Sequence, residues 1–75
     1  MFEKPSDLEI ENRFSYHPPK DDSQKERYQL IRKECGKLAR IIVANTPASD
    51  EQMRSLEHLD LVMMLSNAAI ARTEK

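Results

Sequence analysis

Proline placement is the strongest constraint on the fold of this chain. The four prolines are Pro5, Pro18, Pro19 and Pro47. Because proline in a helix interior removes a backbone hydrogen bond and clashes with the preceding turn, long helices fit only in the intervals 20–46 and 48–75. Each interval has room for a helix of about 23 residues, and a short connection around Pro47 makes the two helices antiparallel. The sequence therefore predicts an all-α fold dominated by a long antiparallel helical hairpin.

Apolar residues in both intervals recur at spacings of three and four, the spacing of a single helix face. Between 22 and 45 this stripe consists of Tyr28, Ile31, Cys35, Leu38 and Ile42. Between 49 and 73 the same spacing holds for Leu56, Leu59, Met63, Ser66 and Ile70, of which the small Ser66 is polar. We expect the two stripes to pack against each other, with helices at about 22–45 and 49–73.

Residues 1–20 precede the hairpin and are predicted to form a short N-terminal helix and a loop that contains aromatic residues and proline. Side chains able to cap a helix stand at the start of each predicted helix: Ser6, Asp22 or Ser23, and Ser49. The loop contains Phe14, Tyr16 and His17, and the two prolines that follow favour an extended backbone. The chain is then a single domain, with the short helix and loop at 1–20 and the hairpin at 21–75.

A chain of 75 residues builds only a small core, so a further source of stability is expected. A single cysteine, Cys35, cannot form an intramolecular disulfide, and two histidines with one cysteine are too few for a structural zinc site. Residues 61–65 are apolar without interruption, and three alanines follow within 68–71, which we place opposite Gly36 in the hairpin. This surplus of apolar residues predicts a symmetric homo-oligomer. The alternative is a wider monomeric core covered by the N-terminal helix.

Charge is distributed unevenly along the chain. The net charge is −1, but residues 13–45 carry eight basic and four acidic side chains, while both ends are acidic. The low overall pI, about 6.1, argues against binding to DNA or RNA. No apolar run approaches the roughly 18 residues of a membrane span, and the first ten residues lack the pattern of a signal peptide. We expect an intracellular, soluble protein that does not bind membranes.

The sequence offers little for catalysis. With one glycine it has no phosphate-binding or dinucleotide-binding glycine loop. Cys35 lies on the apolar stripe, where a small buried side chain is a simpler interpretation than a nucleophile. His58 has no second histidine or cysteine three or four residues away, which is typical of a solvated surface residue. We predict a protein that is not an enzyme and uses neither cofactor nor metal.

Aromatic and basic residues favour a binding site instead. Tyr16 and His17 stand beside Arg13 and a helix on which Lys33 and Lys37 share one face. Aromatic rings stack on nucleobases, and lysine or arginine pairs with phosphate, so this combination indicates a site for a small nucleotide. The simpler interpretation of the charges alone is a solvated helix face.

Three strings of residues resemble a known family. They are RFSYHPPK at 13–20, ERYQLIR at 26–32 and NAAIAR at 67–72. In this order they resemble the phage anti-CBASS cyclic-nucleotide sponge family. The resemblance implies homohexamers of small helical hairpins in the cytoplasm of the infected bacterial host. It also implies that the protein sequesters cyclic oligonucleotides, such as 3′,3′-cGAMP, without cleaving them, and thereby antagonises CBASS immunity.

The resemblance also implies roles for particular residues. Tyr16, in the same motif as His17, would stack on a base of a cyclic dinucleotide. The phosphate-contacting lysine is placed at Lys33, with Lys37 or Arg32 as alternatives within one turn.

A second pocket, for cyclic trinucleotides, would use Arg72 and the position of Cys35. Cys35 stands where the family has a threonine and is a poorer hydrogen-bond donor. Trinucleotide binding is therefore less strongly implied than dinucleotide binding.

One competing hypothesis is a helical-hairpin module that binds another protein and has no nucleotide ligand. It explains the two apolar stripes equally well. It gives no reason for the loop with aromatic residues and proline.

Overall fold

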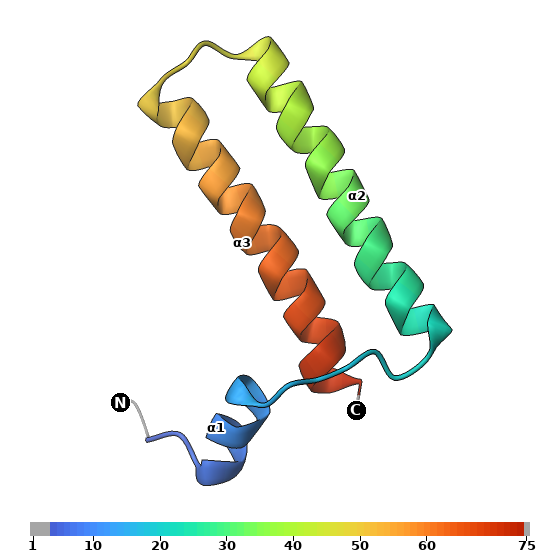
Figure 1. The fold of residues 1–75 in the computed structure, drawn as a ribbon. Helices are drawn as coiled ribbons and strands as arrows, with labels where there is room; N and C mark the ends of the chain where they lie inside the picture. Colours follow the sequence, from blue (N-terminus) through green and yellow to red (C-terminus); the bar gives the residue numbers. More distant parts are fainter. Residues whose placement is uncertain (1–3, 75) are drawn as a thin grey trace.

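The computed structural model describes residues 4–74, and these form three helices. They are α1 (Asp7–Phe14), α2 (Asp22–Asn45) and α3 (Asp50–Thr73). The two long helices lie antiparallel and side by side, and α1 lies beyond their open end (Figure 1). The predicted all-α fold, a short N-terminal helix followed by a long hairpin, is confirmed.

Serine caps begin α1 and α3 as the sequence predicted. The Oγ of Ser6 accepts a hydrogen bond from the Glu9 N–H at 3.1 Å, and the Oγ of Ser49 accepts one from the Gln52 N–H at 3.1 Å. The Gln52 side chain donates to Thr46 at its carbonyl oxygen (3.1 Å) and hydroxyl oxygen (2.9 Å), which holds the 46–49 turn together. These bonds satisfy donors that a helix leaves without intrahelical partners.

The cap of α2 is Asp21, so the prediction of Asp22 or Ser23 was wrong by one or two residues. Asp21 has an extended backbone, and its Oδ1 accepts from the Gln24 N–H at 2.9 Å. Asp22 is already the first helical residue and adds negative charge to the first turn, where the helix dipole favours it. Two adjacent aspartates suit both positions, which is why the sequence did not separate them.

The stripe predicted for α3 faces α2 along its whole length. Leu56, Leu59, Met63 and Ser66 are half-buried, and Ile70 is buried. On α2 the prediction was wrong at one position: Leu38 is 46% exposed, and Ala39 is half-buried in its place. Leu38 is three residues after Cys35 and Ala39 is four, and both spacings lie near one helix face. In the structure it is Ala39 that faces α3.

Gly36 does not face the alanines of α3, so this part of the predicted register was also wrong. Gly36 lies opposite Leu56 and Leu59, whereas Ala68 and Ala71 lie nearer the open end. The short 46–49 turn fixes this register, since residues equally distant from the turn face each other. A Cβ at Gly36 would contact only the Arg40 guanidinium, at 3.7 Å, so the glycine is not required for close approach of α3.

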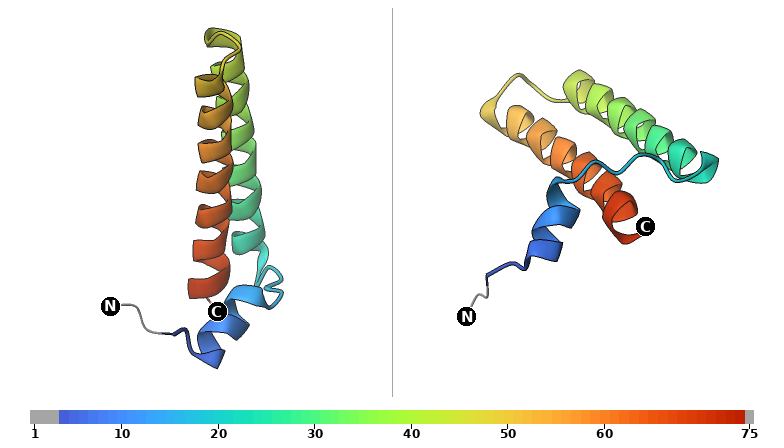
Figure 2. Two further views of the ribbon diagram at one scale, coloured as in Figure 1. Left: turned by 90° about the vertical axis from the view of Figure 1, so that its left-hand side faces the viewer. Right: turned by 60° about the horizontal axis from the view of Figure 1, so that its bottom comes forward.

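The hairpin is one helix layer thick and buries little. The smallest extent of the whole chain is 16 Å, and within residues 4–74 the buried apolar side chains are Tyr28 and Ile70. α1 buries none of its residues and lies past the end of the hairpin, not on its face (Figure 2). The alternative of a core widened by the N-terminal helix is therefore wrong. Large apolar side chains of α3 remain at least half exposed: Met53, Leu61, Val62, Met64 and Leu65.

No helix within residues 4–74 is both long enough and apolar enough to cross a membrane.

Candidate functional site

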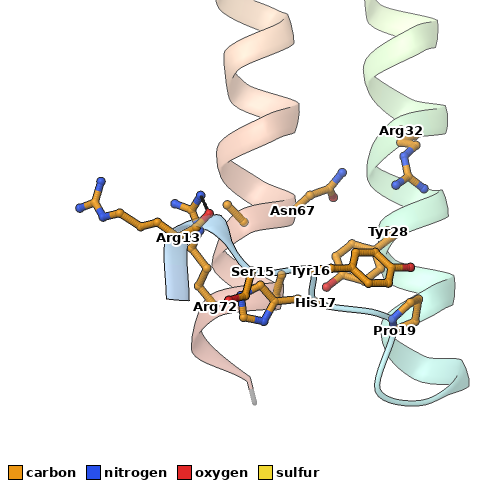
Figure 3. A pocket seen from close by; sticks show the side chains of 11 residues that line it. Arg13, Ser15, Tyr16, His17, Pro19, Tyr28, Arg32, Asn67 and Arg72 are labelled. Atoms are coloured by element: carbon orange, nitrogen blue, oxygen red, sulfur yellow. Dashed lines mark hydrogen bonds between the residues drawn. The ribbon is translucent and has the colours of Figure 1, made fainter. Parts of the chain in front are cut away.

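A groove of about 450 Å³ opens where the loop crosses the open end of the hairpin (Figure 3). We call it the open-end groove. The loop after α1, the first half of α2 and the last turns of α3 all contribute to it. Its lining residues are Arg13, Ser15, Tyr16, His17, Pro19, Tyr28, Arg32, Asn67, Ala68, Ala71 and Arg72. This volume falls within the range of about 300–1,000 Å³ that is typical of small-molecule sites.

Two tyrosines line the groove from different elements. Tyr16 comes from the loop and is 85% exposed, while Tyr28 comes from α2 and is only 7% exposed. In Figure 3 the two side chains extend toward each other from the loop and from α2. The neighbouring ring of His17 donates from Nε2 to the Asn12 carbonyl oxygen at 2.6 Å, which fixes its orientation. The groove therefore offers one exposed ring for stacking beside a rigid wall.

The charge of the groove is positive. It is lined by Arg13, Arg32 and Arg72, and the described lining residues include no acidic side chain. Arg13 pairs with Glu9 at 2.9 Å and its carbonyl oxygen accepts from Arg72 Nη2 at 3.3 Å. Arg32 has no ion-pair partner within residues 4–74. A ligand with negative charge would therefore find complementary groups here, and arginine binds phosphate, as it binds carboxylate, in a two-point contact.

Two polar atoms of the groove are buried without a hydrogen-bond partner. They are the hydroxyl oxygen of Tyr28 and the Oδ1 of Asn67. A buried polar group without a partner costs about 1–3 kcal/mol, so native structures retain few of them. A ligand in the groove would supply the partners that the chain does not.

Three of the residues predicted for the site lie together in the groove: Tyr16, His17 and Arg72. Lys33 and Lys37 are exposed and do not line it, and the Lys37 ammonium instead contacts the Glu34 carboxylate at 3.3 Å. Arg32, which the sequence offered as the alternative within one turn, does line the groove. Within one chain, the basic residue of α2 that can contact a ligand in the groove is therefore Arg32.

Cys35 lies in a different cavity. It is a half-buried free thiol in a groove of about 230 Å³ between α2 and α3, where Gly36 and Ala39 face the leucines of α3. Arg72 does not line this second groove. One chain therefore does not bring Cys35 and Arg72 together.

Sequence reasoning missed three of the residues that line the open-end groove as site residues. The sequence indicates Arg13 only as part of the basic surroundings of the loop. The spacing of Tyr28 places it in the hairpin core, and the sequence does not single out Asn67 as a site residue. The spacing of Tyr28 is that of a core residue, and only its buried hydroxyl distinguishes it from one.

An ion pair closes the open end beside the groove. Arg27 Nη1 lies 2.8 Å from Glu74 Oε2, and Arg27 Nη2 lies 2.6 Å from Glu74 Oε1. Hydrogen bonding to Glu74 raises the pKa of the Arg27 guanidinium, and the same contact lowers the pKa of the Glu74 carboxyl. Both groups stay ionised near neutral pH, so the pair persists there.

Within residues 4–74, no group of three or more histidine, cysteine, aspartate or glutamate side chains is placed to hold a metal ion. His58 is exposed, and its Nδ1 donates to the Arg54 carbonyl oxygen at 2.7 Å.

Comparison with known proteins gave one match. No curated protein and no solved structure matches the chain. A family model described as Acb2/Tad1, hairpin domain, matches residues 6–71, which include α1, the loop, α2 and most of α3. Members of this family are non-catalytic nucleotide sponges that counter the CBASS and Thoeris defences. The resemblance seen in the three sequence strings is therefore confirmed, and this chain belongs to the Acb2/Tad1 hairpin-domain family.

Proposed function

We propose that this protein binds cyclic dinucleotides such as 3′,3′-cGAMP in the open-end groove and sequesters them without cleavage. Family membership implies a cyclic-nucleotide sponge. The observation that carries the proposal is the composition of the groove, in which two tyrosines and three arginines meet with no acidic lining residue among those described.

The chemistry of a cyclic dinucleotide matches this composition. The ligand carries two bases and two phosphates, each phosphate with one negative charge. Tyr16, which is largely exposed, stacks on one base, an interaction worth about 1–3 kcal/mol. Arg32 and Arg72 pair with phosphate oxygens. The unpartnered atoms of Tyr28 and Asn67 form hydrogen bonds with the ligand.

The complete site is proposed to form in a homohexamer. On one chain the groove is open to solvent, and the exposed apolar side chains of α3 supply a surface for subunit contact. Lys33 or Lys37 of a neighbouring subunit then reaches the phosphates that the groove of the first chain holds. In the cytoplasm of the infected bacterium, the hexamer lowers the free messenger concentration and keeps CBASS effectors inactive.

A cyclic trinucleotide site that uses Arg72 and Cys35 requires residues from more than one chain. The two residues line different grooves of the same hairpin. We therefore propose this site only for the assembled oligomer, at a place where several subunits meet.

Calorimetry with 3′,3′-cGAMP tests the proposed function. Phe14→Ala is the matched control for Tyr16→Ala, because Phe14 is 83% exposed and lies two residues away but does not line the groove. We expect Tyr16→Ala to weaken binding by about 5- to 150-fold and Phe14→Ala to leave it unchanged. Absence of binding by the wild-type protein, or equal losses in both variants, contradicts the proposal.

Thermal melting separates the proposal from the protein-interaction hypothesis. A ligand that binds only the folded state raises the melting temperature. If no member of a panel of cyclic dinucleotides does so, the helical-hairpin interaction module becomes the better explanation.

A further inference from the structure

The most buried side chain within residues 4–74 is polar. Gln24, in the first turn of α2, is 3% exposed. Its Oε1 accepts a hydrogen bond from the Lys20 N–H at 2.7 Å, and its Nε2 donates one to the Glu74 carbonyl oxygen at 3.0 Å. One side chain thus joins the end of the loop to the end of α3. A buried amide with both of its functions satisfied is a strong constraint on the segments it connects.

The loop depends on this anchor because of its prolines. Pro18 and Pro19 have no N–H, so the Lys20 amide is the first backbone donor after His17. The prolines also restrict the residues before them to extended conformations, so a fixed Lys20 limits the positions of His17 and Tyr16. The hydrogen bond between Gln24 and Lys20 therefore restricts the position of the Tyr16 ring.

Glu74, the other partner of Gln24, is itself held in place. Its carboxylate forms the two contacts with Arg27, and its N–H donates to the Ile70 carbonyl oxygen at 3.0 Å. These bonds prevent the last turn of α3, which carries Arg72, from fraying. We call Gln24, Arg27 and Glu74 the latch.

We propose that Gln24 is a positioning residue for the ligand, and this rests on the proposed function. By tying the loop of Tyr16 to the end of α3, it sets the distance across the open-end groove before the ligand arrives. The latch residues do not line the open-end groove. Gln24 and Glu74 line an adjoining cavity with Lys20, and this cavity shares Tyr16, His17, Pro19 and Ala71 with the groove. Gln24 acts on affinity by holding the loop, and hydrogen exchange measured without ligand distinguishes this action from direct contact. Preorganisation of this kind improves affinity because the ordering cost is met during folding.

Gln24→Met tests the proposal, because methionine keeps the length of the side chain and removes both hydrogen bonds. Gln29→Met is the matched control, since Gln29 is exposed on the same helix. Two quantities are measured: the Kd for 3′,3′-cGAMP by calorimetry, and backbone amide hydrogen exchange without ligand. If the loop is correctly placed only about one tenth of the time, binding weakens about tenfold. We expect this loss for Gln24→Met together with faster exchange at 15–20, and no change at the centres of α2 and α3 or in Gln29→Met.

A charge exchange provides a second route in case Gln24→Met does not fold. Arg27→Glu and Glu74→Arg should each weaken binding, and the double variant should restore most of the wild-type affinity, since it rebuilds the pair with reversed polarity. A double variant as weak as the sum of the two single variants overturns the proposal.

The results also separate this proposal from the proposed function. If the wild-type protein binds and Gln24→Met binds equally well, the positioning role of Gln24 is overturned while the proposed function stands. If the wild-type protein binds no cyclic dinucleotide, the proposed function fails, and hydrogen exchange alone decides whether Gln24 holds the loop. Unchanged amide hydrogen exchange at 15–20 in Gln24→Met then overturns the positioning role of Gln24 as well.

Discussion

The guanidinium of Arg27 and the carboxylate of Glu74 form a two-point ion pair across the open end of the hairpin, with contacts of 2.8 and 2.6 Å. The pair joins the first turns of α2 to the residue that follows α3. Its side chains are 42% and 44% exposed, so solvent screens the attraction and limits its contribution to the free energy of unfolding. Its importance is geometric, because it holds Glu74, whose carbonyl oxygen accepts a hydrogen bond from Gln24, in place.

Acid should break the ion pair between Arg27 and Glu74. The charged groups that act on Glu74 are Arg27 and Lys20, and with the Gln24 side chain they lower the pKa of its carboxyl below the ordinary 4.5. A carboxyl whose pKa falls on folding adds stability that is complete above its unfolded pKa and disappears as pH drops through the lower folded value. We expect the melting temperatures of wild type and Arg27→Gln to differ above pH 4.5 and to converge in stronger acid. A difference that stays constant throughout the acid range contradicts this role for Glu74.

Tyr28→Phe should separate folding from ligand binding. The Tyr28 hydroxyl is buried and has no partner, so its removal takes away an unpaired polar atom and costs the free protein no hydrogen bond. We expect the free energy of unfolding to stay the same or rise by about 1 kcal/mol, while ligand affinity falls about three- to tenfold. Denaturant unfolding and calorimetry on the same preparations measure both. A destabilised variant with unchanged affinity would mean that the hydroxyl serves the fold and not the ligand.

Arg32→Gln should weaken ligand binding more than Lys37→Gln. Both substitutions remove one positive charge from α2, so any effect of net charge is the same. Arg32 lines the groove without an ion-pair partner among the described residues, whereas Lys37 contacts Glu34 elsewhere on the helix. A charged hydrogen bond to phosphate is worth about 1.5–3 kcal/mol, which corresponds to a loss of roughly 10- to 150-fold. Calorimetry that gives the larger loss for Lys37→Gln would assign the phosphate contact to lysine, from the same or a neighbouring subunit.

Leu65→Glu should disrupt self-association. Leu65 is 66% exposed on α3, and a charge at a subunit contact would be buried at high cost. His58→Glu introduces the same charge at an exposed polar position and serves as the control. In sedimentation experiments we expect an oligomer for the wild type and the control, and a smaller species for Leu65→Glu. A monomeric wild type would contradict the proposed homo-oligomer.

Some features of this chain could be predicted from sequence because they depend on local rules. Proline positions and spacings of three and four define the helices, and the aromatic loop between prolines identifies Tyr16 and His17 as candidates. The exchange of Leu38 for Ala39 was beyond these rules, since neighbouring residues on a helix fit almost the same pattern. The opposition of Gly36 and Leu59 depends on the length of the turn, which spacing along one helix does not reveal.

The contacts among the latch residues could not be predicted from the sequence for a different reason. Gln24 and Glu74 are 50 residues apart, and Arg27 and Glu74 are 47 apart. No periodic pattern links residues that lie so far apart in the sequence. Only the closed hairpin brings them together, and a glutamine in the first turn of a helix otherwise predicts solvent exposure.

Recovery of unchanged ligand from the protein tests whether it sequesters cyclic dinucleotides without cleaving them. The wild-type protein is mixed with 3′,3′-cGAMP, free ligand is removed by filtration, and the retained protein is denatured by heat. Chromatography then identifies what the protein releases. We expect the protein to retain the cyclic dinucleotide and release it unchanged, with retention lost in Tyr16→Ala. Failure of the wild-type protein to retain the ligand, or release of a linear product, would contradict the proposed function.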